Sequence, residues 1–142
     1  YRKNQYQNAL EDMNKSLSLK KTSESYYHRA LIYKELDKLE ESFNDCNIAV
    51  EMSPKDQDAY NLRGVIYLAR GLFDNAIKDL SRAINIAPVD IVYRFNRAEA
   101  YFSHKKYLEA LSDYKVCHKL NPLYKVETIS KRLKEIEAHL KQ

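Results

Sequence analysis

Residues 59–88, AYNLRGVIYLARGLFDNAIKDLSRAINIAP, decide the fold. Their apolar residues recur at helical spacing in two runs, and the second run continues up to Pro88. Between the runs, Gly71 can adopt the positive φ with which helices commonly end. Pro88 stops the second helix, and Asp56 and Asp90 are candidate N-caps for the following helices. The segment therefore predicts two antiparallel helices joined by a short turn.

This helix pair is one of several copies in the chain. The three prolines are evenly spaced, because the step from Pro54 to Pro88 equals the step from Pro88 to Pro122. We call a set of positions related by this step a column. The other columns are Arg29–Arg63–Arg97, Tyr33–Tyr67–Tyr101, Asp45–Asp79–Asp113, Ala30–Gly64–Ala98, Leu39–Phe73–Tyr107, Ser42–Ala76–Ala110, Ala49–Ala83–Cys117 and Met52–Ile86–Leu120. So many columns in one register indicate an internal repeat, in which stacked neighbours complete a core that no unit can bury alone.

Small and aromatic columns have a geometric interpretation. Gly64, Ala76 and Ala83 are expected where the two backbones of a unit approach closely, because a larger side chain would push the helices apart. The columns that contain Tyr67 and Phe73 are expected to fill the wider gaps between units.

The period and these columns, including the segment Tyr60-Asn-Leu-Arg-Gly64-x-x-Tyr67, resemble tetratricopeptide repeats. The resemblance implies an all-α, right-handed α-solenoid of antiparallel helix pairs. Residues 23–56, 57–90 and 91–122 are expected to be full repeats. Residues 1–21 are interpreted as the second helix of a truncated earlier repeat, although its step to the next unit is shorter by one and Lys21 takes the proline position. Because the chain starts with Tyr1 and not methionine, we expect a piece of a longer protein whose array continues upstream.

Residues 123–142 depart from the columns. One narrow apolar stripe runs through them, and charged residues cover the remaining faces; the stripe consists of Val126, Ile129, Leu133, Ile136 and Leu140. This pattern predicts a capping helix that gives the array a polar outer face. The alternative is the first helix of a further, degenerate repeat.

Composition excludes several classes of protein. With 2 glycines and 3 prolines among 142 residues, the chain has too few turn formers for a multi-stranded β domain, and 44% hydrophobic residues are too many for a disordered segment. The net charge is +4, and the basic residues are interspersed with carboxylates and do not gather on one stripe, so we expect no nucleic-acid partner. No apolar run is long enough to predict a membrane span, and no signal peptide is visible. Cys46 and Cys117 are interpreted as buried hydrophobes of a reducing compartment, which favours a cytoplasmic location and leaves a nuclear or organelle-surface one open.

Searching for catalytic chemistry yields no candidate. The chain has no glycine-rich phosphate loop, no zinc-ligand spacing and no nucleophile elbow. Cys117 and His118 are adjacent, so their side chains diverge by about 100° on a helix. We therefore expect a non-enzymatic protein with no catalytic residues, no cofactor and no metal.

The resemblance implies that the first helix of each repeat lines a concave groove. Twelve positions on these helices are predicted to bind a partner: Tyr27, His28, Leu31, Lys34, Asn61, Leu62, Val65, Leu68, Phe95, Asn96, Glu99 and Phe102. Leu62, Leu68, Phe95 and Phe102 are expected to be exposed apolar anchors. The polar residues among the others would set register. The alternative, weighed mainly for Val65 and Val92, is packing between adjacent first helices.

Two recognition modes of similar repeats are disfavoured here. Some relatives hold a C-terminal carboxylate of a chaperone tail with a lysine–asparagine–asparagine–lysine–arginine clamp. In this chain the matching positions hold Tyr27, Leu31, Leu62, Val92 and Asn96. In the register one unit later they hold Asn61, Val65, Asn96, Val126 and Ser130. Only Asn96 in the second register fits. An asparagine ladder would need asparagine at 28, 62 and 96, and the chain has it only at 96.

Taken together, the sequence predicts a protein–protein interaction scaffold whose partner is a peptide or helix of another protein. Two alternatives stay open. The segment could be a structural spacer whose groove is filled by its own chain or by a second copy, or it could be the substrate-docking arm of an enzyme that lies outside it.

Overall fold

In the computed structural model, residues 2–142 are described, and Tyr1 lies outside them. This part of the chain contains helices and no strand. The helices are α1 (Arg2–Leu19), α2 (Ser23–Glu35), α3 (Leu39–Met52), α4 (Gln57–Ala69), α5 (Phe73–Ile86), α6 (Ile91–Ser103), α7 (Tyr107–Leu120) and α8 (Val126–Leu140). The prediction of an all-α fold is confirmed.

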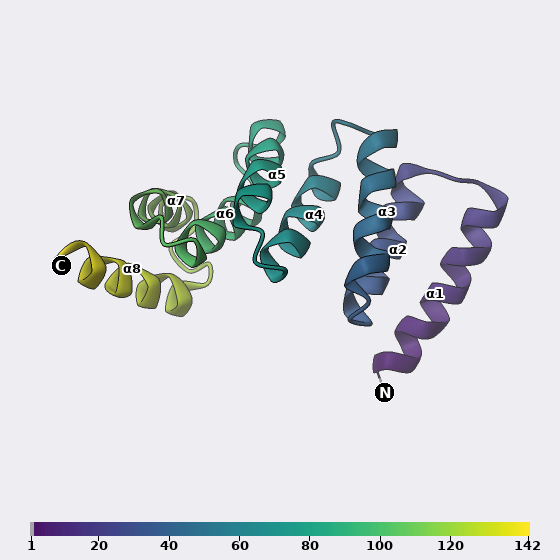
Figure 1. Ribbon diagram of the computed structural model, residues 1–142, viewed down its shortest axis with the longest axis horizontal. Coiled ribbons are helices and arrows are strands. Elements are labelled where there is room, and N and C mark those ends of the chain that lie inside the picture. The colour runs from purple at the N-terminus through teal and green to yellow at the C-terminus, as the bar shows by residue number, and fades with distance from the viewer. Residues whose placement is uncertain (1) are drawn as a thin grey trace.

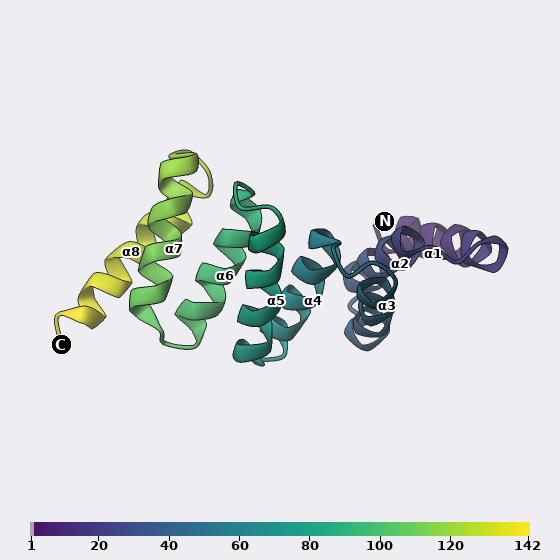
Figure 2. The ribbon, with the colours of Figure 1, turned by 90° about the horizontal axis from the view of Figure 1, so that it is seen from above.

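The helices form successive pairs, α2 with α3, α4 with α5 and α6 with α7, and each pair packs on the next (Figure 1). Helix α1 lies at one end of the row and α8 at the other, in both views (Figures 1 and 2). The chain is therefore an elongated stack of units, and its functional surfaces are the long faces of the stack.

The turn within each pair uses one residue of positive φ. Gly71 has φ 73°, as the sequence predicts, and nothing would obstruct a side chain there. The equivalent positions in the preceding and following units are Asp37 with φ 59° and Lys105 with φ 60°. The turn is thus kept where glycine is absent, although a non-glycine residue is less favourable in the left-handed region.

The first helix of each pair begins at a side-chain cap. Asp56 Oδ1 accepts hydrogen bonds from the backbone N–H groups of Asp58 at 3.0 Å and Ala59 at 3.3 Å. Asp90 Oδ1 accepts from Val92 N–H at 2.9 Å, so both predicted N-caps are confirmed. Thr22, which the sequence analysis did not single out, caps α2 by accepting from Ser25 N–H at 3.0 Å.

Gly64 lies at the closest approach of α4 and α5. A Cβ atom at this position would lie 2.8 Å from Leu80 Cγ and 3.4 Å from the Ala76 carbonyl oxygen. The first distance is too short for a Cβ atom unless Leu80 shifts, whereas the second is an ordinary contact, so the predicted need for a small residue here is confirmed by Leu80. Ala30 and Ala98 in the same column are fully buried.

The arginine and aspartate columns join consecutive units. Arg63 Nε and Nη2 donate to the two carboxylate oxygens of Asp79 at 2.7 and 2.9 Å, and Arg63 Nη1 donates to Asn47 Oδ1 at 3.1 Å. One guanidinium thus binds the second helix of its own unit and that of the preceding unit. The other two units repeat this arrangement with Arg29, Asp45 and Asn14, and with Arg97, Asp113 and Ser81. The sequence revealed these columns but not their role.

Helix α8 uses its apolar stripe to cover the last pair. Ile129 and Ile136 are buried in a cluster with Ala110, Tyr114 and Cys117. The ends of the stripe stay open, because Val126 and Leu140 are 41% and 46% exposed. Whether α8 is a cap or a degenerate repeat stays a matter of interpretation, as do the predicted repeat boundaries.

No helix among residues 2–142 combines the length and apolarity that a membrane span requires. Both cysteines, Cys46 and Cys117, are buried free thiols, as predicted.

Candidate functional site

The candidate site is the set of twelve predicted residues on α2, α4 and α6, which we call the groove face. The structure divides them into three groups. Some are buried between units, some are bonded to other parts of the chain, and some are partly exposed.

Leu62 and Phe95 belong to the buried group, so the expectation that both are exposed anchors is wrong. Leu62 is 4% exposed and packs with Ala30, Cys46 and Ile66. Phe95 is 7% exposed, and its ring meets those of Tyr114 and Tyr124 edge-on. Each fills the space between its first helix and neighbouring helices.

The two valines for which the sequence weighed packing between first helices differ from each other. Val92, for which the sequence weighed inter-unit packing, is 40% exposed. Val65 is partly buried. Helical spacing places a residue on a face, but it does not say how closely the next helix covers that face.

The two groove asparagines bond to one another. Asn96 Nδ2 donates to Asn61 Oδ1 at 2.9 Å, which links α6 to α4 across the face. Within residues 2–142 this bond leaves the Asn61 NH2 group and the Asn96 carbonyl oxygen for a partner. Their predicted contact with a partner backbone stays a prediction.

Glu99 and Phe102 are held by α8. Arg132 Nε and Nη2 each donate to one oxygen of the Glu99 carboxylate at 3.2 Å, and the guanidinium carbon lies 4.3 Å from the centre of the Phe102 ring. The Tyr114 hydroxyl also donates to Glu99. Sequence reasoning missed Arg132, because Glu99 and Arg132 are far apart along the chain and only the fold brings them together. These contacts occupy the α6 end of the groove face.

The open part lies on α2 and α4. It consists of exposed His28 and partly buried Tyr27, Leu31, Lys34, Val65 and Leu68. His28 Nε2 lies 3.4 Å from Glu24 Oε1, and the His28 ring lies 5.5 Å from that of Tyr27. We call these six residues the open groove.

Carboxylates at one edge of the open groove affect nearby phenols. Burial, aided by the charges of Asp58 and Asp56, raises the pKa of Tyr27 from its ordinary 10.0 to about 12. The Tyr93 hydroxyl donates to Asp58, and burial together with this bond raises the Tyr93 pKa. Tyr27 therefore presents a neutral phenol near physiological pH, and Asp58 is a polar neighbour of the open groove.

The described residues offer little for catalysis or metal binding. Residues 2–142 contain no group of three or more His, Cys, Asp or Glu side chains placed to hold a metal ion. Burial raises the pKa of the Cys46 thiol from 9.0 to about 12 and that of Cys117 to about 11, which makes both poor nucleophiles at neutral pH. Such a surface can bind through apolar side chains and hydrogen bonds.

Family models match two parts of the chain. The model described as YpiA-like, tetratricopeptide repeats, matches residues 69–121, and a tetratricopeptide repeat model matches residues 23–56. The chain is a tetratricopeptide repeat protein. The predicted family and the all-α solenoid of helix pairs are confirmed by these matches and by solved structures of the same fold.

Among curated proteins, this tetratricopeptide repeat chain is 28% identical over 137 residues to a DnaJ homolog subfamily C member 7 homolog from Dictyostelium discoideum. The match covers 93% of the chain and 23% of that protein, so the chain spans about a quarter of its relative.

Three solved structures share the fold. The first tetratricopeptide domain of Spaghetti (RPAP3), bound to the HSP90 peptide SRMEEVD, matches with TM-score 0.80 and 19% identity over 85% of this chain and 94% of that one. YrrB, described as having an unusual peptide-binding site, matches with TM-score 0.80 and 18% identity over 92% and 68%. The Arabidopsis OM64 domain matches with TM-score 0.77 and 20% identity over 83% and 96%. At these identities the likeness shows the fold alone.

Proposed function

We propose that this chain is a non-enzymatic protein–protein interaction module that binds a peptide or helix of another protein on its groove face. One observation carries the proposal: the open groove presents partly exposed Leu31, Val65 and Leu68 at positions whose residue type changes from one unit to the next. Leu31 and Leu68 each pack against the core with part of their surface, and the part that stays exposed is available for recognition.

Within the open groove, Leu68 keeps the role of apolar anchor that the sequence analysis gave it, and Leu31 takes the role that it gave to Leu62 and Phe95. Tyr27, His28 and Lys34 supply a phenol, an imidazole and an ammonium group that can fix the direction of a bound segment. Structures of the same fold that contain or are described as binding peptides support this use of the surface. A cytoplasmic location for the chain belongs to the same proposal and agrees with two free cysteines.

The groove does not provide for an acidic C-terminal tail. At the five positions where relatives place clamp residues, this chain has Tyr27, Leu31, Leu62, Val92 and Asn96, none of which carries a positive charge. We therefore predict that the peptide SRMEEVD, seen with Spaghetti (RPAP3), does not bind this chain at micromolar concentration. Isothermal titration calorimetry checks this. Saturable binding that is lost on changing Tyr27 or Asn96 to alanine would contradict it.

A displayed library of random peptides, selected on the immobilised chain, tests the function itself. A peptide that the wild type selects should bind Leu68→Glu at least tenfold more weakly, because a carboxylate replaces a partly exposed apolar contact. Met52→Glu is the matched control, since Met52 is 49% exposed at the end of α3, a second helix. Circular dichroism should show equal helix content in both variants. If Met52→Glu weakens binding as much as Leu68→Glu does, the groove assignment fails.

A further inference from the structure

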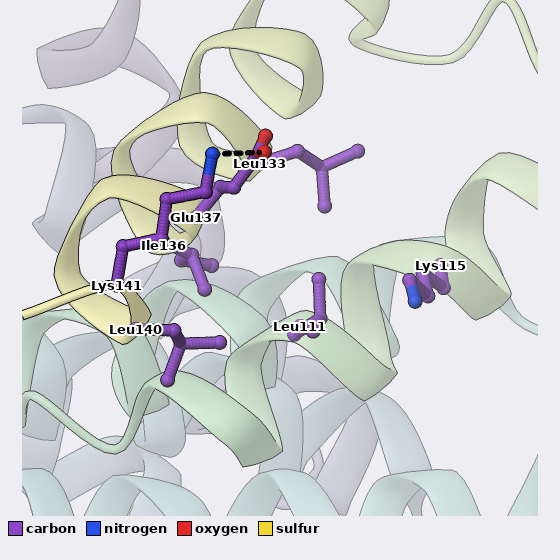
Figure 3. Close-up of a pocket in the computed structure, with 7 residues that line it drawn as sticks. All are labelled: Leu111, Lys115, Leu133, Ile136, Glu137, Leu140 and Lys141. Carbon is purple, nitrogen blue, oxygen red and sulfur yellow. Dashed lines mark ion pairs between the residues drawn. The ribbon is translucent and has the colours of Figure 1, made fainter.

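An apolar cleft lies between α7 and α8, two helices that contribute no residue to the groove face. It has a volume of about 360 Å³ and is lined by Leu111, Lys115, Leu133, Ile136, Glu137, Leu140 and Lys141. Figure 3 shows Leu111 and Leu140 coming from the two helices beside this space, with the Glu137–Lys141 ion pair on the α8 side. Its size is that of a small ligand site.

The equivalent space between α3 and α4 is closed by the chain itself. The Arg70 guanidinium lies 4.7 Å from the centre of the Phe43 ring and donates to Glu40 Oε2 at 2.7 Å. The Tyr67 ring meets that of Phe43 edge-on, with 5.3 Å between centres. An aromatic ring and an ion pair together cover this junction.

Helices α5 and α6 meet in a related way. His104 Nε2 lies 3.3 Å from Asp74 Oδ1, and the His104 ring lies 5.3 Å from that of Phe73. The acidic position that Glu40 and Asp74 occupy becomes Leu108 on α7, and Leu108 is 66% exposed. At the last junction leucine takes the acidic position, while the aromatic contact is kept: the Tyr107 ring, at the position of Phe73, stacks on the His139 ring with 4.4 Å between centres.

Charge around the cleft favours one kind of occupant. Residues 105–142 contain nine Lys+Arg and five Asp+Glu, an excess of four that equals the net charge of the whole chain. Lys115 on the rim has no ion-pair partner among residues 2–142. Lys141, whose side chain is 74% exposed, also lines the cleft and pairs with Glu137 at 3.0 Å. An apolar floor beside such exposed cations complements an acidic amphipathic segment.

We propose that the α7–α8 cleft is a second docking site, which binds an acidic amphipathic helix of another protein. The helix places leucine-sized side chains against Leu111, Leu133 and Leu140, and its carboxylates face Lys115 and Lys141. Recognition of this type uses apolar side chains at i, i+3 or i+4 and i+7. The site shares no residue with the open groove, so it stands independently of the proposed function.

The test uses a fluorescent 18-residue helical peptide with leucine at i, i+3, i+4 and i+7 and mainly glutamate elsewhere. Fluorescence anisotropy in low salt is expected to show saturable binding that weakens as salt is added. Leu140→Glu should weaken binding at least tenfold and Lys115→Glu about threefold, while Leu68→Glu in the open groove leaves it unchanged. A matched peptide with lysine in place of glutamate should not bind.

Three results would overturn the proposal: no binding of the acidic peptide, equal binding of the lysine peptide, or unchanged binding to Leu140→Glu. Leu140 and Lys115 are exposed, so neither substitution should alter folding, which thermal melting checks. Light scattering over a range of protein concentrations tests whether a second copy of the chain occupies the cleft instead. Self-association that Leu140→Glu abolishes would assign the cleft to a second copy of the chain and contradict an acidic partner.

Discussion

Each inner junction and the α7–α8 junction joins the second helix of a pair to the helix that follows it, but the side chains at these junctions differ. Between α3 and α4, Arg70, Phe43 and Glu40 seal the surface, whereas leucines leave a cleft between α7 and α8. The comparison teaches that the recurring columns maintain the stack, and we propose that binding surfaces arise where the residue at a position changes between units. In the open groove, Leu31 and Val65 are followed by Glu99 at the same position, and Leu68 is preceded at its own position by Lys34.

The largest effect is expected when a guanidinium group is removed from an inner unit. Arg63→Met leaves the Asp79 carboxylate, 2% exposed, without its bidentate partner and also breaks the bond to Asn47. The bond from Arg82 Nη1 to Asp79 Oδ1 at 3.2 Å remains. Loss of one partner of a buried ion pair costs about 3–5 kcal/mol, and because Arg82 still pairs with Asp79, we expect a decrease of about 3 kcal/mol in the free energy of unfolding, measured with urea.

Arg132→Met at the α8 end is the matched control. Arg132 and Glu99 side chains are 27% and 22% exposed, so water can solvate the carboxylate that is left behind. We expect a loss of about 1 kcal/mol. Equal losses for the two variants would contradict the distinction between inner units and the end of the stack.

A smaller effect should follow from filling the inner helix crossing. In Gly64→Val, Cβ would lie 2.8 Å from Leu80 Cγ, so the buried Leu80 side chain or the helices must shift, and we expect a loss of about 2 kcal/mol in the free energy of unfolding measured with urea. Gly71→Ala has open space around it but a φ of 73°, which costs about 1 kcal/mol. A larger loss for Gly71→Ala than for Gly64→Val would show that the turn, and not the close approach, limits the unit.

The smallest expected effect is a difference between the modification rates of the two thiols. Cys46 lies inside the stack and Cys117 lies under α8; burial raises their pKa values to about 12 and about 11. A raised pKa lowers the thiolate fraction, so iodoacetamide at pH 8.5 should modify both much more slowly in the folded chain than in urea, and Cys117 faster than Cys46. Peptide mass spectrometry measures the rates. Faster labelling of Cys46 would contradict the order.

The same shifts set a pH dependence of stability. The pKa values of both thiols in the folded chain exceed the ordinary 9.0. The contribution of the two protonated thiols to the free energy of unfolding is therefore fully present below pH 9 and is lost as the pH rises through 11 to 12. Stability measured with urea should therefore decrease above pH 9, and Cys46→Ala should reduce that slope. An unchanged slope in the variant would assign the loss to other groups.

The features that recur from unit to unit could be predicted from the sequence. Proline spacing, the caps Asp56 and Asp90, the Gly71 turn and the Gly64 crossing each follow from local chemistry that is repeated from unit to unit. The columns of Arg63 and Asp79 were visible too. Their joint bond to the preceding unit was not, because it depends on how neighbouring units stack.

The groove was predicted less well for a physical reason. Helical periodicity shows that Leu62 and Phe95 share a face with Leu68, but depth on that face depends on the next helix. The pairing of Arg132 with Glu99 joins a repeat to a segment outside the repeat pattern, so no column could reveal it.

Photo-crosslinking tests the central claim, recognition at the open groove, most directly. The photoreactive residue p-benzoylphenylalanine is placed at Leu68 in one variant and at Met52 in another, and each is irradiated with the library-selected peptide. We predict that the peptide is crosslinked from position 68 and not from position 52. Crosslinking from position 52 without crosslinking from position 68 would contradict the claim that the first-helix face binds the partner.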